Sequence, residues 1–287
     1  MNILLTGKGK SGSWKIRGEQ LGAAIGQTVI AQASEASIRA SDAVVLVKRP
    51  FDSIVAECHR LNKPIIWDVV DSWPQPYGNL WDRSMCIHWA QDMVKQINPA
   101  AIIAATRKMA SDFMDFVKVP VKWIPHHGRP GIAINPIREQ IAVVGYEGGE
   151  NYVSQWGRII QQQCRDRGWL FSCASGPDAL ASFDIVVALR DPDVHGGYAP
   201  RHWKSNVKLA NAHASGTPFV GNRESGYLET MCGAEYWADN KYQLSMAFDW
   251  LERQDTRQKV HREFIHSAIS LESVASEYSS WIRQLRL

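Results

Sequence analysis

The sequence predicts an α/β protein built from two Rossmann-like, doubly wound domains that face each other across a cleft. Short apolar runs alternate with helix-like stretches along the chain, which is the pattern of parallel β-α-β units. This pattern restarts after residues 119–136, a segment rich in proline and glycine. With 287 residues, the chain also exceeds the usual size of a single domain.

The first half of the chain opens with an apolar run at residues 2–6, followed by a glycine-rich basic stretch and a helical pattern. Further apolar runs lie at residues 44–47, 65–67 and 102–104, with a helix-like segment at 53–61. We expect these elements to form an N-terminal, acceptor-side domain of residues 1–133.

The second half repeats this alternation. Apolar runs lie at residues 141–145, 185–189 and 219–220, with a helix-like segment at 152–167. They predict a C-terminal, nucleotide-binding domain of residues 134–268. Residues 269–287 are predicted to form a C-terminal helix that packs back on the N-terminal domain.

Composition excludes several classes of protein. No run of about 18 apolar residues and no signal-peptide pattern is present, so we expect a soluble, cytoplasmic protein without a membrane partner. The five cysteines are scattered without zinc-type spacing, which predicts reduced thiols and no metal site. Residues 1–130 hold 16 Lys and Arg against 11 Asp and Glu. This excess favours a polyanionic partner at the N-terminal domain, although a solvated basic face would produce it too.

A G-x-G-x-x-G pattern at residues 7–12 follows the first predicted strand. Gln32 stands where a dinucleotide site would have an acidic residue for the ribose, which argues against an NAD(P) enzyme. Lys10 and Ser11 resemble part of a phosphate loop, but Leu4 replaces its first glycine, which argues against a P-loop NTPase.

The same loop is basic, and its cations lie at the mouth of a predicted sheet, where they could contact phosphates. A solvated turn leading into a helix is the alternative. The candidate acceptor-binding residues are Lys8, Lys10, Ser13, Trp14, Lys15 and Arg17.

Two carboxylates follow the apolar run at residues 65–67, where the carboxyl edge of the sheet is expected. Asp68 or Asp71 could accept the proton of an acceptor hydroxyl and is therefore a candidate catalytic base. Alternatively, one of them caps a turn and the other binds a helix N-terminus.

Two stretches resemble motifs of the GT-B glycosyltransferases. In these enzymes a helix of small residues ends at A-x-G-x-P, a buried strand follows, and G-x-x-E begins the next helix; the matching residues here are Ala214, Gly216, Pro218, Gly226 and Glu229. The stretch D-x-x-D-x-W-P of the N-terminal domain is matched by Asp68, Asp71, Trp73 and Pro74.

The resemblance implies a GT-B fold and the transfer of a sugar from a nucleotide-sugar to an acceptor hydroxyl. The expected donor is a UDP-sugar, and neither a metal nor a further cofactor is expected. It places Glu229 on the donor ribose, because a carboxylate accepts two adjacent hydroxyl donors well. It places Lys208 and Arg190 on the pyrophosphate. The two-glutamate motif of common retaining families aligns with Trp203 and Asn211, so the stereochemistry stays open.

The loop after the first strand of the second domain could hold a phosphate at a helix N-terminus. With it, the expected donor-binding residues are Gly145, Glu147, Gly148, Gly149, Arg190, Lys208, Gly226, Tyr227 and Glu229. The polar loop at residues 190–204 is expected to line the cleft. His126 and His127 at the hinge either contact the donor or bind only backbone.

The short chain and its basic, tryptophan-containing loop resemble compact bacteriophage glycosyltransferases that modify hydroxymethylated pyrimidines in DNA, which would place the protein in the host cytoplasm. Loop cations would then contact DNA phosphates, and a flipped base would bring its hydroxymethyl group to Asp71 or Asp68. The alternatives are a transferase acting on a glycan or small metabolite, and a non-catalytic nucleotide- or nucleic-acid-binding protein. Sugar, nucleotide and oligomeric state stay open.

Overall fold

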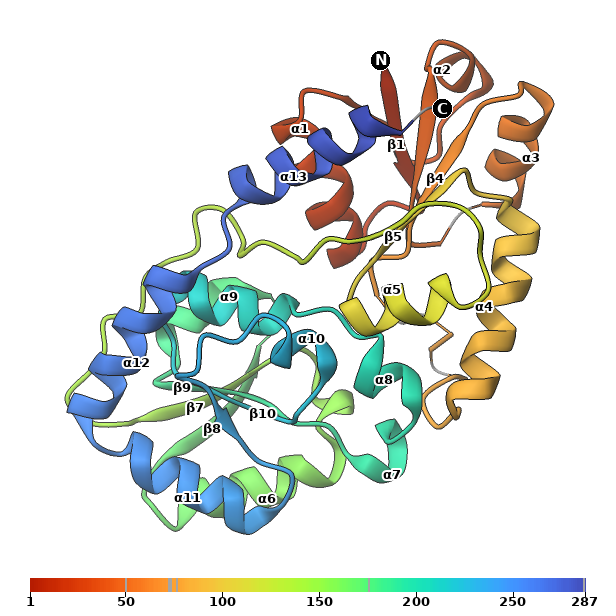
Figure 1. Cartoon of the computed structure of the whole chain (residues 1–287). Helices are drawn as coiled ribbons and strands as arrows, with labels where there is room; N and C mark the ends of the chain where they lie inside the picture. Colours follow the sequence, from red (N-terminus) through yellow and green to blue (C-terminus); the bar gives the residue numbers. More distant parts are fainter. Residues whose placement is uncertain (50, 72–73, 76, 175, 286) are drawn as a thin grey trace. The chain divides into compact units, whose positions relative to one another are not determined.

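The chain folds into two compact units. The computed structural model describes residues 1–49, 51–71, 74–75, 77–174, 176–285 and 287. Unit 1 comprises Met1–His126, Gly197–Ser205 and Leu271–Leu287, and unit 2 comprises His127–Gly196 and Asn206–Ser270. Each unit contains one parallel sheet flanked by helices, which confirms the predicted α/β class with two doubly wound sheets (Figure 1).

The sheet of unit 1 has the strand order β2-β1-β3-β4-β5-β6, and its paired strands are parallel. Its strands are β1 (Ile3–Gly7), β2 (Thr28–Val29), β3 (Ala43–Val47), β4 (Ile65–Asp68), β5 (Ala101–Ala104) and β6 (Val121–Trp123). The central strands β1, β3, β4 and β5 are buried along their whole length. Burial on both faces explains why they are continuous apolar runs in the sequence.

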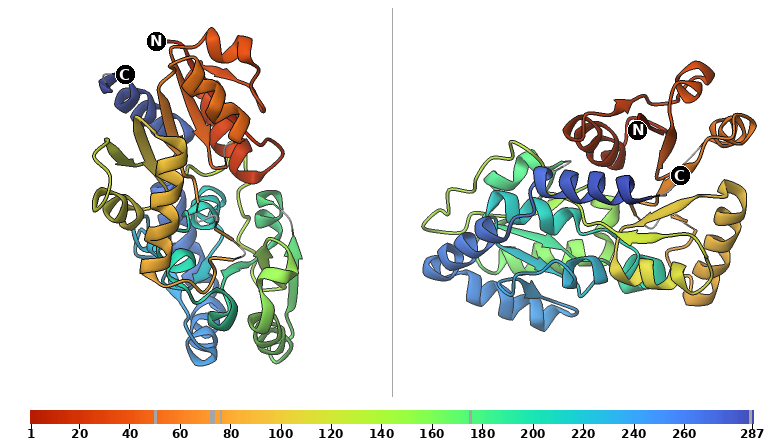
Figure 2. Two further views of the ribbon diagram at one scale, coloured as in Figure 1. Left: turned by 90° about the vertical axis from the view of Figure 1, so that its right-hand side faces the viewer. Right: turned by 45° about the horizontal axis from the view of Figure 1, so that its top comes forward.

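Helices cover both faces of this sheet. They are η1 (Trp14–Gln20), α1 (Leu21–Ala24), α2 (Glu35–Arg39), α3 (Asp52–Arg60), α4 (Arg83–Ile97), α5 (Arg107–Met114), α8 (Tyr198–His202) and α13 (Leu271–Gln284). Figures 1 and 2 show α1 and α13 on one face and α3, α4 and α5 on the other. Asp82 and Thr106 begin α4 and α5 by accepting backbone N–H bonds from Met85 and Met109.

The sheet of unit 2 has the strand order β11-β10-β9-β7-β8, again with parallel pairs. Its strands are β7 (Val143–Glu147), β8 (Leu170–Ala174), β9 (Ile185–Ala188), β10 (Phe219–Gly221) and β11 (Tyr236–Trp237). β7 begins later than the apolar run predicted, because the amides of Ala142 and Val143 donate to the Asp184 carboxylate.

The helices of unit 2 also lie on both faces of its sheet. They are η2 (Glu150–Tyr152), α6 (Ser154–Arg165), η3 (Pro177–Ser182), α7 (Pro192–His195), α9 (Val207–Ser215), α10 (Ser225–Leu228), α11 (Lys241–Leu251) and α12 (Gln254–Ser267). Figure 1 shows α6 and α11 on one face and α9 and α12 on the other. No helix in the described ranges has both the length and the apolar character that crossing a membrane requires.

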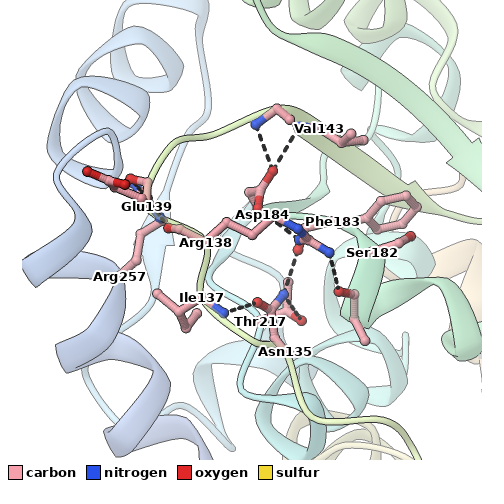
Figure 3. Close-up of polar contacts among 12 residues, drawn as sticks. Asn135, Ile137, Arg138, Glu139, Val143, Ser182, Phe183, Asp184, Thr217 and Arg257 are labelled. Atoms are coloured by element: carbon pink, nitrogen blue, oxygen red, sulfur yellow. Dashed lines mark hydrogen bonds and ion pairs between the residues drawn. The ribbon is translucent and has the colours of Figure 1, made fainter.

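The end of the segment predicted as a linker is hydrogen-bonded to unit 2. The Asn135 amide donates to the backbone oxygen of Phe183 and to the Thr217 hydroxyl, and Arg257 donates to the backbone oxygens of Arg138 and Glu139 (Figure 3). Buried polar groups satisfied in this way fix the backbone. The division between the two units falls between His126 and His127, within the segment predicted as the linker.

The short segment Gly197–Ser205 interrupts unit 2 in the sequence and packs in unit 1. The Tyr198 hydroxyl and the Trp203 indole donate to Asp112 Oδ2 over 2.7 and 2.9 Å. Burial alone would raise the pKa of Asp112, but these donors together with Lys108 hold it below its ordinary value. A buried, hydrogen-bonded carboxylate thus anchors the segment.

Candidate functional site

The carboxyl edge of the unit 2 sheet contains a topological switch point. From β7 the chain first adds β8 on one side and then returns to place β9 on the other side of β7. In open α/β sheets, ligands bind outside the carboxyl ends of the strands at such a point. The loops after β7, β9 and β10 all begin at this edge, and each carries predicted donor-binding residues.

The loop after β7 is shaped by glycine. Gly148 has φ +146°, and a Cβ there would lie 2.9 Å from the Tyr146 ring and 3.3 Å from Lys208 Nζ. Gly145 is buried, and a Cβ on it would lie 2.0 Å from the Phe183 ring. Gly148 therefore lets the loop approach Lys208, whereas Gly145 is required for packing of the strand.

Lys208, Glu147 and Asn211 form one polar network. Lys208, in the first turn of α9, binds the backbone oxygen of Glu147 and lies 3.9 Å from the centroid of the Tyr146 ring. One turn later, the Asn211 amide donates to Glu147 Oε1 over 3.1 Å. Burial raises the pKa of Glu147, and the charge of Lys208 only partly offsets that effect. The structure thus joins two predicted donor-binding residues, and it adds Asn211.

Arg190, after β9, forms a buried ion pair. Its Nε lies 2.5 Å from Glu224 Oε1, and the two side chains are only 11% and 4% exposed. Tyr227, from α10, is also buried, and burial raises its pKa well above the ordinary value. Glu224 also lies at this edge, and the sequence motifs do not mark it, because it lies between β10 and the motif residues Gly226 and Glu229.

The remaining donor candidates lie on the same edge. Gly226 is buried in α10, and Glu229 is half-buried at the residue that ends this helix. Gly149 is exposed and precedes η2, so the glycine loop leads first into a short 3₁₀ turn, and α6 begins only at Ser154. The helix-like segment predicted at residues 152–167 is thus divided between η2 and α6, which ends at Arg165.

The equivalent edge of unit 1 lies between β1 and β3, where its own strand order reverses. After β1, Lys8 and Lys10 in the loop and Lys15 in η1 are exposed, and Ser13 is half-buried. Trp14 and Arg17 are buried instead, at 4% and 0% exposure. The indole of Trp14 donates to Glu19 and packs against Gly18. Trp14 and Arg17 therefore belong to the core of unit 1 and offer no surface to an acceptor.

Asp68 is buried with Arg17 and Tyr278. It has no exposed surface, accepts a hydrogen bond from the Tyr278 hydroxyl over 3.2 Å, and lies 3.9 Å from Arg17 Nε. Burial raises the pKa of Asp68, opposed by the charge of Arg17 and the hydrogen bond from Tyr278. A carboxylate so enclosed is placed to hold β4, η1 and α13 together.

Asp71 is presented by a strained turn. Val70 has φ +65°, and the amide of Asp71 donates to the backbone oxygen of Val69 over 2.7 Å, which closes a γ-turn with positive φ. A β-branched residue adopts this conformation only at a cost of about 1–3 kcal/mol, and such strain clusters at functional sites. His126 supports the turn, with Nε2 3.3 Å from the backbone oxygen of Val70.

Two lysines meet at Asp71. Lys48 Nζ and Lys204 Nζ lie 3.5 and 3.2 Å from the same oxygen, Asp71 Oδ2. Lys48 also donates to the Ser13 hydroxyl over 3.3 Å. The sequence did not single out either lysine, although Lys48 ends an apolar run and Lys204 lies in the predicted functional loop. Trp73 of the D-x-x-D-x-W-P stretch lies outside the described residues.

One group of potential metal ligands occurs in the described ranges, although the sequence predicts none. His213, Cys232 and Glu235 place their ligand atoms within 4.8 Å of one another. Glu235 accepts the amides of Cys232 and Gly233 and lies 2.7 Å from His213 Nε2. These hydrogen bonds outweigh the effect of burial and lower the pKa of Glu235 to about 2. His213 and Glu235 thus form a buried hydrogen-bonded pair, which lies before β11 and away from the carboxyl edge.

The comparisons with known proteins support the fold. No protein-family model matches the sequence, and no curated protein matches it. Among solved structures, HepE of Anabaena in complex with UDP and glucose superposes with a TM-score of 0.70 at 10% identity, covering 99% of this chain and 100% of that one. AviGT4, a glycosyltransferase involved in avilamycin A biosynthesis, gives a TM-score of 0.59 at 12% identity, covering 99% and 98%.

A third similar structure is the lipopolysaccharide outer core galactosyltransferase WaaB, with a TM-score of 0.60 at 9% identity, covering 99% of this chain and 100% of that one. Similarity over the full length of all three chains shows that this protein has the GT-B fold, as the motifs predict. At these identities, activity and ligands do not transfer with the fold.

Proposed function

We propose that this protein is a glycosyltransferase that moves a sugar from a UDP-sugar to an acceptor hydroxyl. The observation that carries the proposal is the network of Lys208, Glu147 and Asn211 at the switch point of the unit 2 sheet. A similar fold binds UDP-glucose in HepE of Anabaena, which supports the choice of donor.

In this proposal the donor binds at the carboxyl edge of unit 2. Lys208 and Arg190 contact the diphosphate and stabilise the negative charge that develops on the leaving UDP. Arg190 would share its guanidinium between the diphosphate and Glu224, its present partner. Glu229 takes the ribose hydroxyls, and the glycine loop gives the phosphates close access to the backbone. No metal has a role in this proposal.

Asp71 is the proposed catalytic base. The acceptor oxygen bonds to the anomeric carbon of the sugar, the bond from that carbon to the β-phosphate oxygen breaks, and the hydroxyl proton passes to Asp71. Asp68 is assigned no step, because it is fully buried. Its role in the proposal is to support the strand that ends at the Val70 turn.

For the acceptor, we propose the hydroxymethyl group of a modified pyrimidine in DNA. Exposed Lys8, Lys10 and Lys15 support this choice, because lysines at a sheet edge can contact backbone phosphates. A glycan or small metabolite is the competing acceptor, and binding of a neutral one would depend little on salt.

The test is a transfer assay with the full chain. Purified protein is incubated with hydroxymethylated DNA and a panel of UDP-sugars without added metal, and nucleoside mass and free UDP are measured. We expect a sugar-sized mass gain and UDP release, both strongly reduced in Lys208→Ala and Glu229→Ala but retained in Lys259→Ala, an exposed lysine on α12. UDP release without DNA modification would move the acceptor to another class. UDP binding that survives both substitutions would refute the donor site.

A further inference from the structure

The carboxyl edge of unit 1 has a strong excess of positive charge close to Asp71. Lys48 and Lys204 share one oxygen of this carboxylate, so the three groups together carry a net positive charge. Their side chains are largely enclosed, with exposures of 23%, 14% and 16% for Lys48, Lys204 and Asp71. Screening by solvent is weaker for such groups than for surface lysines.

The surrounding residues add to this charge. Lys8 and Lys10 lie exposed on the loop after β1, and Lys15 lies exposed at the start of η1, two residues after the Ser13 that contacts Lys48. Arg49 follows Lys48 and donates to the backbone oxygen of Gln75. The neighbouring carboxylate Asp68 is already enclosed with Arg17 in the core. Within the described residues, these lysines and Arg49 give this edge more cations than carboxylates, even with exposed Glu19 and Asp52 counted beside Asp71.

The donors in this place fit a phosphate group. Two ammonium groups that converge on one oxygen can instead bridge two oxygens of a phosphate, and the Ser13 hydroxyl supplies a third donor beside Lys48. Lys48 follows β3 with φ +62°, and Lys204 Nζ donates to Gln75 Oε1 over 3.1 Å, which helps to hold both ammonium groups in place. A phosphate would take over the contacts that Asp71 now makes and leave its carboxylate beside the acceptor.

We infer that Lys48, Lys204 and Ser13 form a subsite for a phosphate group of the acceptor. The inference rests on the proposed function in assigning the acceptor to unit 1. Either a backbone phosphodiester of a nucleic acid or a terminal phosphate on a sugar or other small acceptor supplies this chemistry.

The test measures binding of two probes to the full chain. The probes are a short fluorescent DNA duplex and glycerol 3-phosphate, titrated at fixed ionic strength into the wild type and the double variant Lys48→Gln, Lys204→Gln. The matched control is Lys95→Gln, Lys118→Gln, which removes the same charge from exposed lysines before the amino ends of β5 and β6.

We expect the double variant to bind at least one probe about tenfold or more weakly than the control. Loss with the duplex, with a salt slope reduced by about 2, assigns the phosphodiester source. Loss with glycerol 3-phosphate alone assigns a terminal phosphate. Equal binding by both variants, or no binding of either probe by the wild type, would overturn the inference.

A parallel titration with UDP separates this inference from the proposed function. UDP affinity should be unchanged in the double variant, because the proposed donor site uses unit 2 residues. If UDP binding falls with the two lysines, they belong to the donor site and the inference is wrong. If UDP does not bind at all while the phosphate probes do, the proposed function fails and the subsite stands.

Discussion

At the carboxyl edge of unit 2, the cations are matched by acidic or aromatic partners, whereas at the same edge of unit 1 cations exceed carboxylates. Arg190 is paired with Glu224, and Lys208 contacts Tyr146 and the backbone of Glu147. In unit 1, two lysines share Asp71 and further lysines are exposed around it. Both edges are switch points of parallel sheets, so topology alone does not produce this difference.

Under the proposed function, the two edges bind two kinds of ligand. At the edge of unit 2 the cations already have partners that orient them. Such a preformed network suits the diphosphate of a nucleotide, which is the same in every reaction cycle. The edge of unit 1 has a net positive charge, which attracts an anion from a distance and then binds it. Substitutions should therefore affect the two edges in different ways.

The largest expected effect is on the rate of transfer when Asp71 is changed. Asp71→Asn removes the proposed base while retaining the shape of the side chain, and we expect kcat to fall by roughly 10²- to 10⁴-fold. UDP affinity should not change, because the donor edge is untouched. Steady-state kinetics with a UDP titration checks both points; a variant that retains the wild-type kcat would remove Asp71 from the mechanism.

The next effect concerns stability rather than catalysis. Asp68→Ala leaves the guanidinium of Arg17 buried without its carboxylate, and we expect a loss of about 3–5 kcal/mol in the free energy of unfolding. Tyr278→Phe removes one hydrogen bond and should cost about 1 kcal/mol. Urea denaturation measures both, with Asp92→Ala on the exposed side of α4 as the control. Losses equal to that of the control would show that the buried cluster does not hold unit 1.

The smallest effect tests the donor edge. Burial raises the pKa of Glu147 above its ordinary 4.5, so the folded state binds this proton more tightly than the unfolded state. The stabilisation is complete below pH 4.5 and is lost as pH rises through the raised pKa. Glu147→Gln should abolish this loss and stabilise the protein by about 0.5–1 kcal/mol at neutral pH. Urea unfolding curves of the wild type and of Glu147→Gln at pH 4.5 and at neutral pH give the change in the free energy of unfolding with pH. The same change in both proteins would contradict the assignment.

Much of the fold follows from the sequence because its central strands are buried on both faces. β1, β3, β4 and β9 stand out as apolar runs for this reason. The edge strands β2, β6, β8 and β11 were missed, because they are short and partly exposed and leave no such run. The return of residues 197–205 to unit 1 depends on Asp112, a contact distant in sequence.

The candidate site was predictable only where it follows local motifs. Lys208 and Glu147 were found from their motif and their strand-end position, and the structure places them in contact. The pairing of Arg190 with Glu224 and the meeting of Lys48 with Lys204 arise from loops that converge in space, and spacing along the chain does not encode them. Burial of Trp14 and Arg17 likewise arises from the packing of η1 in unit 1, which the basic character of the segment does not reveal.

The most direct test of the account is a calorimetric titration of UDP into the wild type, Lys208→Ala and the exposed-lysine control Lys259→Ala. Loss of one charge-assisted contact to a diphosphate should weaken binding by roughly 10- to 100-fold. The account predicts that the wild type and the control bind one UDP per chain with equal affinity and that Lys208→Ala shows this loss. Equal affinity in all three proteins, or no UDP binding by the wild type, would contradict a donor site at the carboxyl edge of unit 2.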